Sequence, residues 1–444
     1  MKFTPRKKGL STPGRYALVF AALMAAFFLL LYLAGLVPQR LVFENVKASA
    51  AQFHEESRQP SAYGCYPQLL YHGEGSYQLD NGSELRILHQ SLYLDTRADP
   101  ASVLENPYWA AEESDGPLED LRQLSRMEEP PAPNDRYSRY LMGFRAVVRP
   151  LLALFPYPEI RRIVMWTVLL LFALVTAGFA KSMGLRMALL FAGCFLTANP
   201  VMIVSSLQFS CCFVLAFAAM AAVLFLRTSQ ERVPLLLFIT GALTQYFDFY
   251  TTPVLTLVLP AGTALLLLQQ EGRLQRPKQA LIFLGRCLLA WAAAYVGSWL
   301  CKLALTELCT DEPAWRTAMA SFAGRLGLSG TGEYDASFYS PLRALRLCAA
   351  NLLSPGSAVL FLGIAALLLW GFLRAGDKRA LLAAAPGYLA LALVPVIWIM
   401  VAAQPSIIHE YFQYRTLTGT VFAACCMAAL PRPGGGNREP SAIQ

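Results

Sequence analysis

The sequence predicts an all-α polytopic membrane protein with about ten transmembrane helices and a large outer loop after the first of them. The chain of 444 residues is 56% hydrophobic and only 15% charged, whereas a soluble domain is about a quarter charged. Its mean hydropathy is +0.43, and many apolar runs reach the ~20 residues that cross about 30 Å of hydrocarbon. Arg and Lys gather in the short links between these runs, as the positive-inside rule requires.

The N-terminal part predicts a cytoplasmic tail at 1–15 and a first transmembrane helix at 16–36. The tail is basic, and basic flanks stay in the cytoplasm. The apolar run lacks a small-residue cleavage site and is too long for the apolar region of a signal peptide. We therefore expect an uncleaved anchor.

The segment 37–158 is the one long polar stretch of the chain, and it is predicted to be an outer loop. Within it we expect an interfacial helix at 137–155. Arg145 and Arg149 are four residues apart and share one helical face, and the other face is apolar. Such a helix turns its arginines towards phosphate groups, either in a binding site or generically on anionic lipid.

The remaining apolar runs predict transmembrane helices two to seven within 159–302 and eight to ten within 358–430. A second outer loop at 303–357 separates the two groups. The runs are 163–180, 185–203, 207–226, 233–249, 251–269, 279–301, 358–374, 380–402 and 411–430. Each is long and apolar enough to predict a membrane-embedded helix.

The basic links fix the expected orientation, with both termini in the cytoplasm, including the tail at 431–444. Two parts of this topology leave an alternative open. The run 185–203 contains Asn199-Pro200, and the pair of helices within 233–269 is interrupted by a polar tip. Either could instead be a re-entrant or broken helix.

Composition and motifs also exclude several classes of protein. The net charge of +8 comes from residues in the links, and no basic stripe with interleaved aromatics is present, so no nucleic-acid partner is expected. Most of the ten cysteines lie inside apolar runs, where they act as small packing residues; one outer disulfide is possible, a framework is not. The chain lacks a Walker loop, a GxSxG, a CxxC pair and an HExxH motif. A nucleotide-driven pump or a zinc hydrolase is therefore not expected.

Three acids on the outer side are candidate catalytic residues. Glu44 closely follows the first span, where a carboxylate can act as general base on an acceptor hydroxyl; the alternative is a solvated acid. Asp80 could form a dyad or hold a divalent cation through oxygen ligands, or simply make an Asx-turn with Asn81. Asp248 lies among aromatics at the outer end of a span, and its alternative role is an ion pair with an outer-loop arginine.

A second set of outer residues is predicted to bind a substrate phosphate. Arginine binds phosphate through two parallel hydrogen bonds and is hard to discharge. The candidates are Arg139, Tyr140, Arg145, Arg149, His409 and Arg415. The alternative at the last two positions is structural, with Glu410 and Arg415 fixing a helix end.

The layout resembles the membrane glycosyltransferases of the GT-C type, which use polyprenyl-phosphate sugars. Glu44 matches the position of their early acid, here without an adjacent second acid. The segments from Tyr137-Ser-Arg139-Tyr140 to Arg149-Pro150 and Gln245-Tyr-Phe-Asp248 are also similar to those of a group of bacterial multi-span membrane proteins. Trp-His is frequent in that group where this chain has Leu141-Met142.

The resemblance implies an enzyme of the bacterial inner membrane. It would transfer a sugar, as a hexosyltransferase does, from a polyprenyl-phosphate carrier to a lipid, glycan or protein acceptor of the cell envelope. Glu44 would be the base, with Asp80 or Asp248 assisting, and the arginines would stabilise the leaving phosphate. No cofactor is expected beyond a possible divalent cation. The alternatives are a transporter or flippase for a lipid-linked glycan, and a non-catalytic envelope-assembly scaffold.

Overall fold

The computed structural model describes residues 12–58, 66–68, 75–226, 228–248, 250–326, 328, 335–353, 360–366, 369, 373 and 378–430. Helices dominate these residues, which confirms the all-α prediction. The described strands are β1 (Pro107–Tyr108) and β2 (Asp135–Arg136), which pair antiparallel, with Pro107 opposite Arg136 and Tyr108 opposite Asp135.

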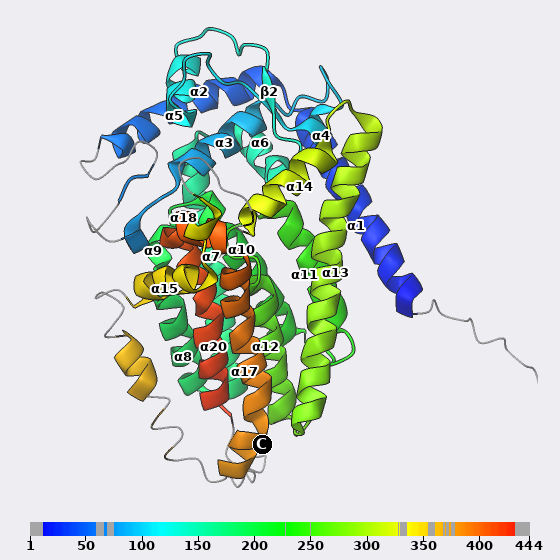
Figure 1. The fold of residues 1–444 in the computed structure, drawn as a ribbon, viewed down its shortest axis with the longest axis vertical. Coiled ribbons are helices and arrows are strands. Elements are labelled where there is room, and N and C mark those ends of the chain that lie inside the picture. The colour runs from blue at the N-terminus through cyan, green and yellow to red at the C-terminus, as the bar shows by residue number, and fades with distance from the viewer. Residues whose placement is uncertain are drawn as a thin grey trace, which may run out of the picture.

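The helices form two layers, a bundle of long helices and an outer layer of short ones across one end of it (Figure 1). The bundle consists of α1 (Thr12–Gly35), α7 (Tyr157–Met183), α8 (Leu185–Leu196), α9 (Pro200–Val204), α10 (Leu207–Phe225), α11 (Val233–Phe247), α12 (Leu255–Gln270), α13 (Pro277–Cys309), α17 (Lys378–Val401) and α20 (Thr418–Ala428). The first outer segment contributes α2 (Gln39–Ser57), η1 (Gly75–Tyr77), α3 (Asn81–Leu92), α4 (Ser102–Glu105), α5 (Pro117–Leu124) and α6 (Arg145–Leu152). Later outer segments contribute α14 (Ala314–Arg325), η2 (Ala336–Phe338), α15 (Pro341–Leu352), α18 (Ala403–Ile408), α19 (Glu410–Gln413) and η3 (Tyr414–Leu417).

Five described helices are long and apolar enough to cross a membrane: α1, α7, α10, α13 and residues Leu382–Val401 of α17. Three shorter apolar helices, α8, α11 and α12, lie beside them. These helices confirm the prediction of a polytopic membrane protein. The expected number of ten spans stays a prediction, and most of the expected span at 358–374 lies outside the described residues.

Two of the expected spans are broken. In the run 185–203, α8 ends at Leu196, Asn199 takes a left-handed conformation with φ of 54°, and Pro200 begins the short helix α9. The run 411–430 divides into α19, η3 and α20. The run 185–203 is therefore a broken helix, which is one of the two alternatives predicted for it. The bundle still has a continuous apolar core, made by α7, α8, α10, α12, α13, α17 and α20.

The helix α13 connects the bundle to the outer layer. Its 33 residues extend about 50 Å at 1.5 Å per residue, well beyond the ~30 Å of a hydrocarbon core. Near its outer end, the buried Lys302 donates hydrogen bonds to the carbonyl of Ser138 (2.9 Å), to the hydroxyl of Thr306 (2.6 Å) and to the carbonyl of Leu104. A buried ammonium group needs a partner for each of its three hydrogens. Lys302 therefore fixes the outer layer to the bundle.

The expected interfacial helix at 137–155 differs from the structure in extent and in orientation. The helix α6 covers only Arg145–Leu152, and the guanidinium groups of Arg145 and Arg149 are fully buried. They donate to backbone carbonyls of the outer layer at 2.6–3.1 Å. The acceptors are Met142, Ser102 and Val103 for Arg145, and Ser91, Leu92 and Val37 for Arg149. Carbonyls near helix ends lack partners within their own helix, so the arginines serve as caps. Neither arginine faces a membrane phosphate.

Candidate functional site

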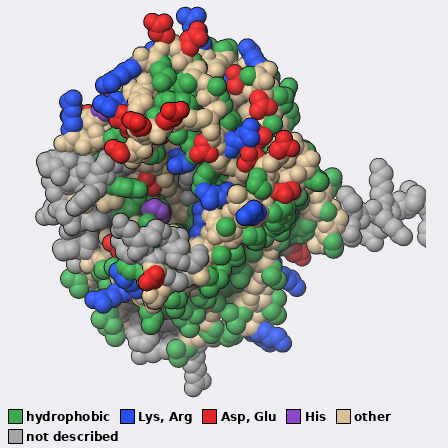
Figure 2. Space-filling view, turned by 45° about the horizontal axis from the view of Figure 1, so that its top comes forward, with side chains coloured by type: hydrophobic (Ala, Val, Ile, Leu, Met, Phe, Trp, Pro, Cys, Tyr) green, Lys and Arg blue, Asp and Glu red, His purple; other side chains and the backbone are tan. Residues whose placement is uncertain are grey.

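A cavity of about 700 Å³ lies where the outer layer meets the bundle. It is lined by Asp80, Ser83, Arg86, Tyr108, Asp135, Arg136, Tyr137, Arg139, Gln208, Tyr250, Ala320, Ser321, Gly324, Arg325, Gln404, Pro405, His409 and Phe412. We call it the outer cavity. Figure 2 shows a hollow on this face, bordered by Lys or Arg side chains and with a His side chain beside it.

Four arginines line the outer cavity. Arg136 pairs with carboxylates. The other three are Arg86 on α3, Arg139 in the loop before α6, and Arg325 at the end of α14. Among the described residues, none of the three forms an ion pair with a carboxylate. Asp80 and Asp135 line the same cavity, but cations that are not paired with a carboxylate favour an anionic ligand.

Tyrosine rings hold these arginines in place. The guanidinium of Arg325 lies 4.1 Å from the ring centroid of Tyr250, and that of Arg139 lies 4.4 Å from the ring of Tyr137. Arg86 lies 5.3 Å from the same Tyr137 ring. Stacking on an aromatic face stabilises the cation and leaves its N–H groups able to donate in the ring plane. The cavity thus presents donors suited to a phosphate group.

Asp80 supplies a carboxylate to the same cavity. It is the N-cap of α3 and accepts hydrogen bonds from the backbone N–H of Ser83 (3.0 Å) and from its hydroxyl (2.8 Å). Asp80 thus caps α3 and does not form the expected Asx-turn with Asn81, and its carboxylate also lines the cavity. The hydroxyl of Tyr411 also makes a hydrogen bond to Asp80. A carboxylate has four lone-pair sites, so Asp80 can still accept one more proton or hydrogen bond.

His409 lies close to Asp80. Burial lowers the pKa of His409, the negative charge of Asp80 opposes this effect, and Arg325 adds to it. The imidazole is therefore neutral at pH 7. Its ring stacks on Phe412 with centroids 5.1 Å apart, and Nδ1 lies 3.4 Å from the hydroxyl of Tyr411. A neutral imidazole can both donate and accept a hydrogen bond.

Gln208, at the start of α10, adds an amide group to the cavity. The side chain is buried, and its Oε1 atom has no hydrogen-bond partner among the described residues. The position of Gln208 is fixed by Glu84, which accepts from the Gln208 backbone N–H (2.8 Å) and the Ser206 hydroxyl (2.8 Å). An unpaired buried amide oxygen is unfavourable, and a hydroxyl group of a ligand would satisfy it.

The structure brings together some of the predicted site residues and separates others. Asp80, Arg139 and His409 all line the outer cavity. Tyr140 does not line the cavity itself, but its ring contacts the cavity residue Arg325, whose guanidinium lies 5.0 Å from the ring centroid. Asp248 does not line the cavity; it accepts from the Thr251 backbone (3.1 Å) and hydroxyl (2.6 Å) and so shapes the turn that leads to Tyr250.

Glu44, Arg145, Arg149 and Arg415 are not part of the outer cavity. Glu44 is exposed on α2. Arg415 is buried and donates to the carbonyls of Ala198, Tyr411 and Ser76 at 2.9, 3.2 and 3.2 Å. Arg415 thus has a structural role, as in the alternative given above. Its hydrogen-bond acceptors are backbone carbonyls and not the expected Glu410.

Four further residues line the cavity that were not predicted from the sequence: Arg86, Arg325, Tyr250 and Gln208. Arg86 follows the cavity residue Asp80 by six positions, which gives no helical signal of a shared face. Arg325 is brought to the cavity by the position of α14, and that position depends on tertiary contacts. The four residues carry no recognisable motif.

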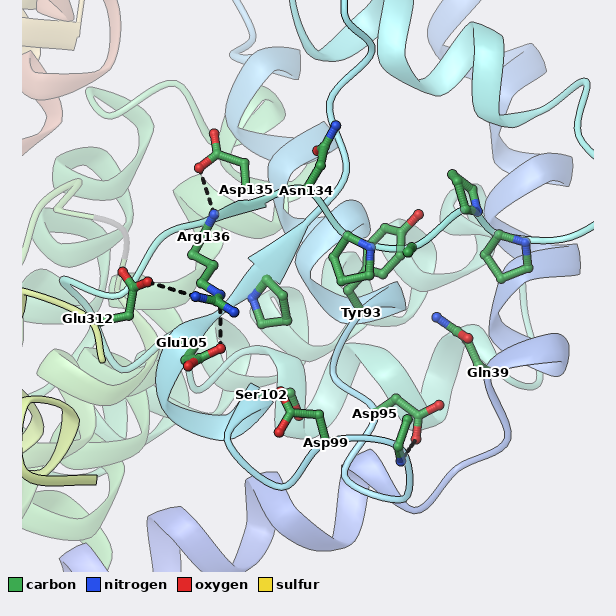
Figure 3. Close-up of a pocket in the computed structure, with 16 residues that line it drawn as sticks. Gln39, Tyr93, Asp95, Asp99, Ser102, Glu105, Asn134, Asp135, Arg136 and Glu312 are labelled. Carbon is green, nitrogen blue, oxygen red and sulfur yellow. Dashed lines mark hydrogen bonds and ion pairs between the residues drawn. The ribbon is translucent and has the colours of Figure 1, made fainter. Parts of the chain in front are cut away.

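A second cavity, of about 780 Å³, lies on the outer layer beside the first and shares Asp135 and Arg136 with it. Figure 3 shows Arg136 between two carboxylates, 3.0 Å from Glu105 and 3.1 Å from Glu312. Burial raises the pKa of Glu105, and the charge of Arg136 opposes the shift. Arg136 is therefore neutralised, unlike the other three arginines of the outer cavity. Within the described part of the chain, no group of three or more His, Cys, Asp or Glu residues could hold a metal ion.

Comparison with known proteins adds no relative to this picture. No family model matches the chain, and neither a curated protein nor a solved structure matches it. The resemblance to GT-C glycosyltransferases therefore stays a prediction. The fold and the site define a helical membrane protein with an arginine-lined cavity at one end of its bundle.

Proposed function

We propose that the protein is a glycosyltransferase of the bacterial inner membrane, with both termini in the cytoplasm and the outer cavity on the opposite face. It takes a sugar from a polyprenyl-phosphate carrier and transfers it to a lipid, glycan or protein of the cell envelope. The observation that carries this proposal is the group of three arginines without carboxylate partners, in one cavity with Asp80.

The arginines suit the leaving group of such a reaction. As the sugar departs, negative charge develops on the phosphate, and fixed donors aimed at that charge stabilise the transition state. Guanidinium groups make paired hydrogen bonds to phosphate oxygens. Arg86, Arg139 and Arg325 are supplied by three separate segments, so they can surround one phosphate group.

Asp80 is the proposed general base, in place of Glu44. The transfer forms a bond between the acceptor oxygen and the anomeric carbon of the sugar and breaks the bond from that carbon to the phosphate oxygen. The electron pair of the broken bond leaves with the phosphate, and the hydroxyl proton goes to Asp80. Glu44 is exposed on the far side of α2, and its carboxylate does not line the cavity.

Gln208 and His409 are the proposed hydroxyl-binding groups. The Gln208 amide has an unpaired oxygen, and sugar hydroxyls donate hydrogen bonds to such acceptors. The neutral His409 imidazole can position the acceptor hydroxyl beside Asp80.

The test is a transfer assay with protein in vesicles that contain a polyprenyl-phosphate sugar and envelope lipid extract. Asp80→Asn keeps the helix cap but removes the proton acceptor, so turnover should fall about 10²–10⁴-fold. The matched control, Glu44→Gln, should keep wild-type turnover. Loss of activity in the Glu44 variant with full activity in the Asp80 variant would return the base to Glu44. Movement of intact lipid-linked sugar across the membrane without transfer would favour a flippase, and neither transfer nor movement would favour a scaffold.

A further inference from the structure

The helix α14 has two different faces, one that lines the outer cavity and one that is apolar and exposed. Ala320, Ser321, Gly324 and Arg325 line the outer cavity. By helical geometry these positions share one face. Three of them are small residues, which allows α14 to lie close against the cavity.

The opposite face of α14 is apolar and exposed. Trp315, Met319 and Phe322 follow the i, i+4, i+7 spacing of a single stripe, and their exposed fractions are 38%, 42% and 44%. Between the two faces, Ala314 and Ala318 are buried against Leu303 of α13. The three side chains of the stripe are therefore partly exposed at the surface, and Phe322 also contacts Trp299 of α13.

The contacts between α13 and α14 show that the stripe turns back towards the membrane. The Trp315 backbone N–H donates to Glu307 of α13 (3.3 Å). Two turns later on α14, the Phe322 ring lies 6.2 Å from that of Trp299, which is eight residues, or about 12 Å, lower on α13. The two helices thus run antiparallel, and α14 slopes across the junction between the outer layer and the bundle (Figure 1).

At this depth the stripe meets the membrane-facing surface of α13. Val296 and Leu300, in the apolar part of that spanning helix, are 45% and 39% exposed. Phe322 lies beside Trp299, one residue from Leu300, so the stripe continues the surface that faces lipid. Apolar side chains with a Trp at this level are typical of helices that lie in the interface between headgroups and acyl chains.

We propose that α14 docks on the membrane, with Met319 and Phe322 inserted into the leaflet on the side of the outer cavity. The occupant of the stripe is phospholipid at the boundary between headgroups and acyl chains. The helix then forms the wall between the bilayer and the cavity. This inference does not depend on glycosyl transfer and would hold for any ligand of the cavity.

Membrane docking of α14 bears on two of the three cavity arginines. Arg325 ends α14 itself. The indole N–H of Trp299, which the Phe322 ring contacts, donates to the carbonyl of Arg139 (3.0 Å). Lipid contact with the stripe therefore stabilises the elements that hold Arg139 and Arg325.

The experiment places a photo-crosslinking amino acid at Met319 or Phe322 of the full chain, in vesicles of zwitterionic and anionic phospholipid. Leu300 is the positive control, and Thr317, which is exposed on the other side of α14, is the matched control. The adduct is identified by the mass of the intact protein. Each variant is first checked for a single species in gel filtration.

Lipid adducts should form at Met319 and Phe322 with yields close to that at Leu300, and Thr317 should give about tenfold less. Adducts at Leu300 but none at the two stripe positions would overturn the proposal. Adducts joining two copies of the chain through Met319 or Phe322 would also overturn it, because the stripe would then be a protein interface. Failure of glycosyl transfer leaves all of these outcomes unchanged.

Discussion

Two sets of arginines on the same side of the molecule have opposite surroundings. Arg145, Arg149 and Arg415 are buried and donate to backbone carbonyls. The cavity set, Arg86, Arg139 and Arg325, rests on tyrosine rings without carboxylate partners. The partner of a guanidinium group therefore decides its role. Arginines that donate to backbone carbonyls hold the outer layer together, and arginines without a carboxylate partner are available to a ligand.

The largest expected effect on stability belongs to the buried set. Arg149→Met removes the donor to three carbonyls. Leu92 keeps a hydrogen bond from Gln39 at 3.4 Å, so two carbonyls lose their side-chain donor, at a cost of about 1–3 kcal/mol for each unsatisfied group. The free energy of unfolding in mixed micelles should fall by about 2–6 kcal/mol. A wild-type unfolding midpoint would mean that these hydrogen bonds do not hold the outer layer.

The stability of the outer layer should depend on pH through the buried His89. Burial lowers the pKa of His89 to about 4, Asp120 opposes the shift and Arg86 adds to it. Because the folded state resists protonation, the unfolded state binds more protons below pH 6.5, and stability falls as the pH drops from 6.5 towards 4. The slope contributed by His89 should reach about 1.4 kcal/mol per pH unit. The slope should decrease in His89→Asn, and an unchanged slope would contradict the assignment.

The smallest effect is expected in the cavity set. Arg86→Met removes a cation that lies 5.2 and 5.3 Å from the rings of Tyr108 and Tyr137, but it also removes repulsion between like charges. The two effects oppose each other, so the free energy of unfolding should change by no more than about 0.5 kcal/mol. A loss as large as that of Arg149→Met would show that Arg86 is structural, and the distinction between the two sets would fail.

The sequence was sufficient for the fold class and for part of the site. Long apolar runs and basic links predicted the membrane helices, because hydrophobicity acts locally along the chain. The outward orientation of the Glu44 side chain could also have been predicted from the sequence. Val42, Phe43 and Val46 are buried on α2, and this apolar stripe turns Glu44 outward. The prediction of a catalytic Glu44 relied on its distance from the first span and did not use this periodicity.

The roles of the arginines could not be predicted in the same way. The spacing of Arg145 and Arg149 correctly places both on one face, but their carbonyl partners include Ser102 and Leu92, more than forty positions away. A phosphate and a set of orphan carbonyls attract the same side chain. Only the tertiary structure tells which of the two is present, and the same limit applies to Arg325, which α14 carries to the cavity.

The most direct test of the account is the affinity of the purified protein for a polyprenyl-phosphate analogue, in neutral detergent without anionic lipid. The triple variant Arg86→Lys, Arg139→Lys and Arg325→Lys keeps the charge of the cavity but loses the planar forks. The matched control is Arg122→Lys on α5, an exposed arginine that pairs with Glu119 at 2.6 Å. We expect affinity at least about tenfold weaker in the triple variant, equivalent to 1.4 kcal/mol or more, and unchanged affinity in the control. Equal affinity of the wild type and the triple variant would contradict a phosphate-binding role of these arginines.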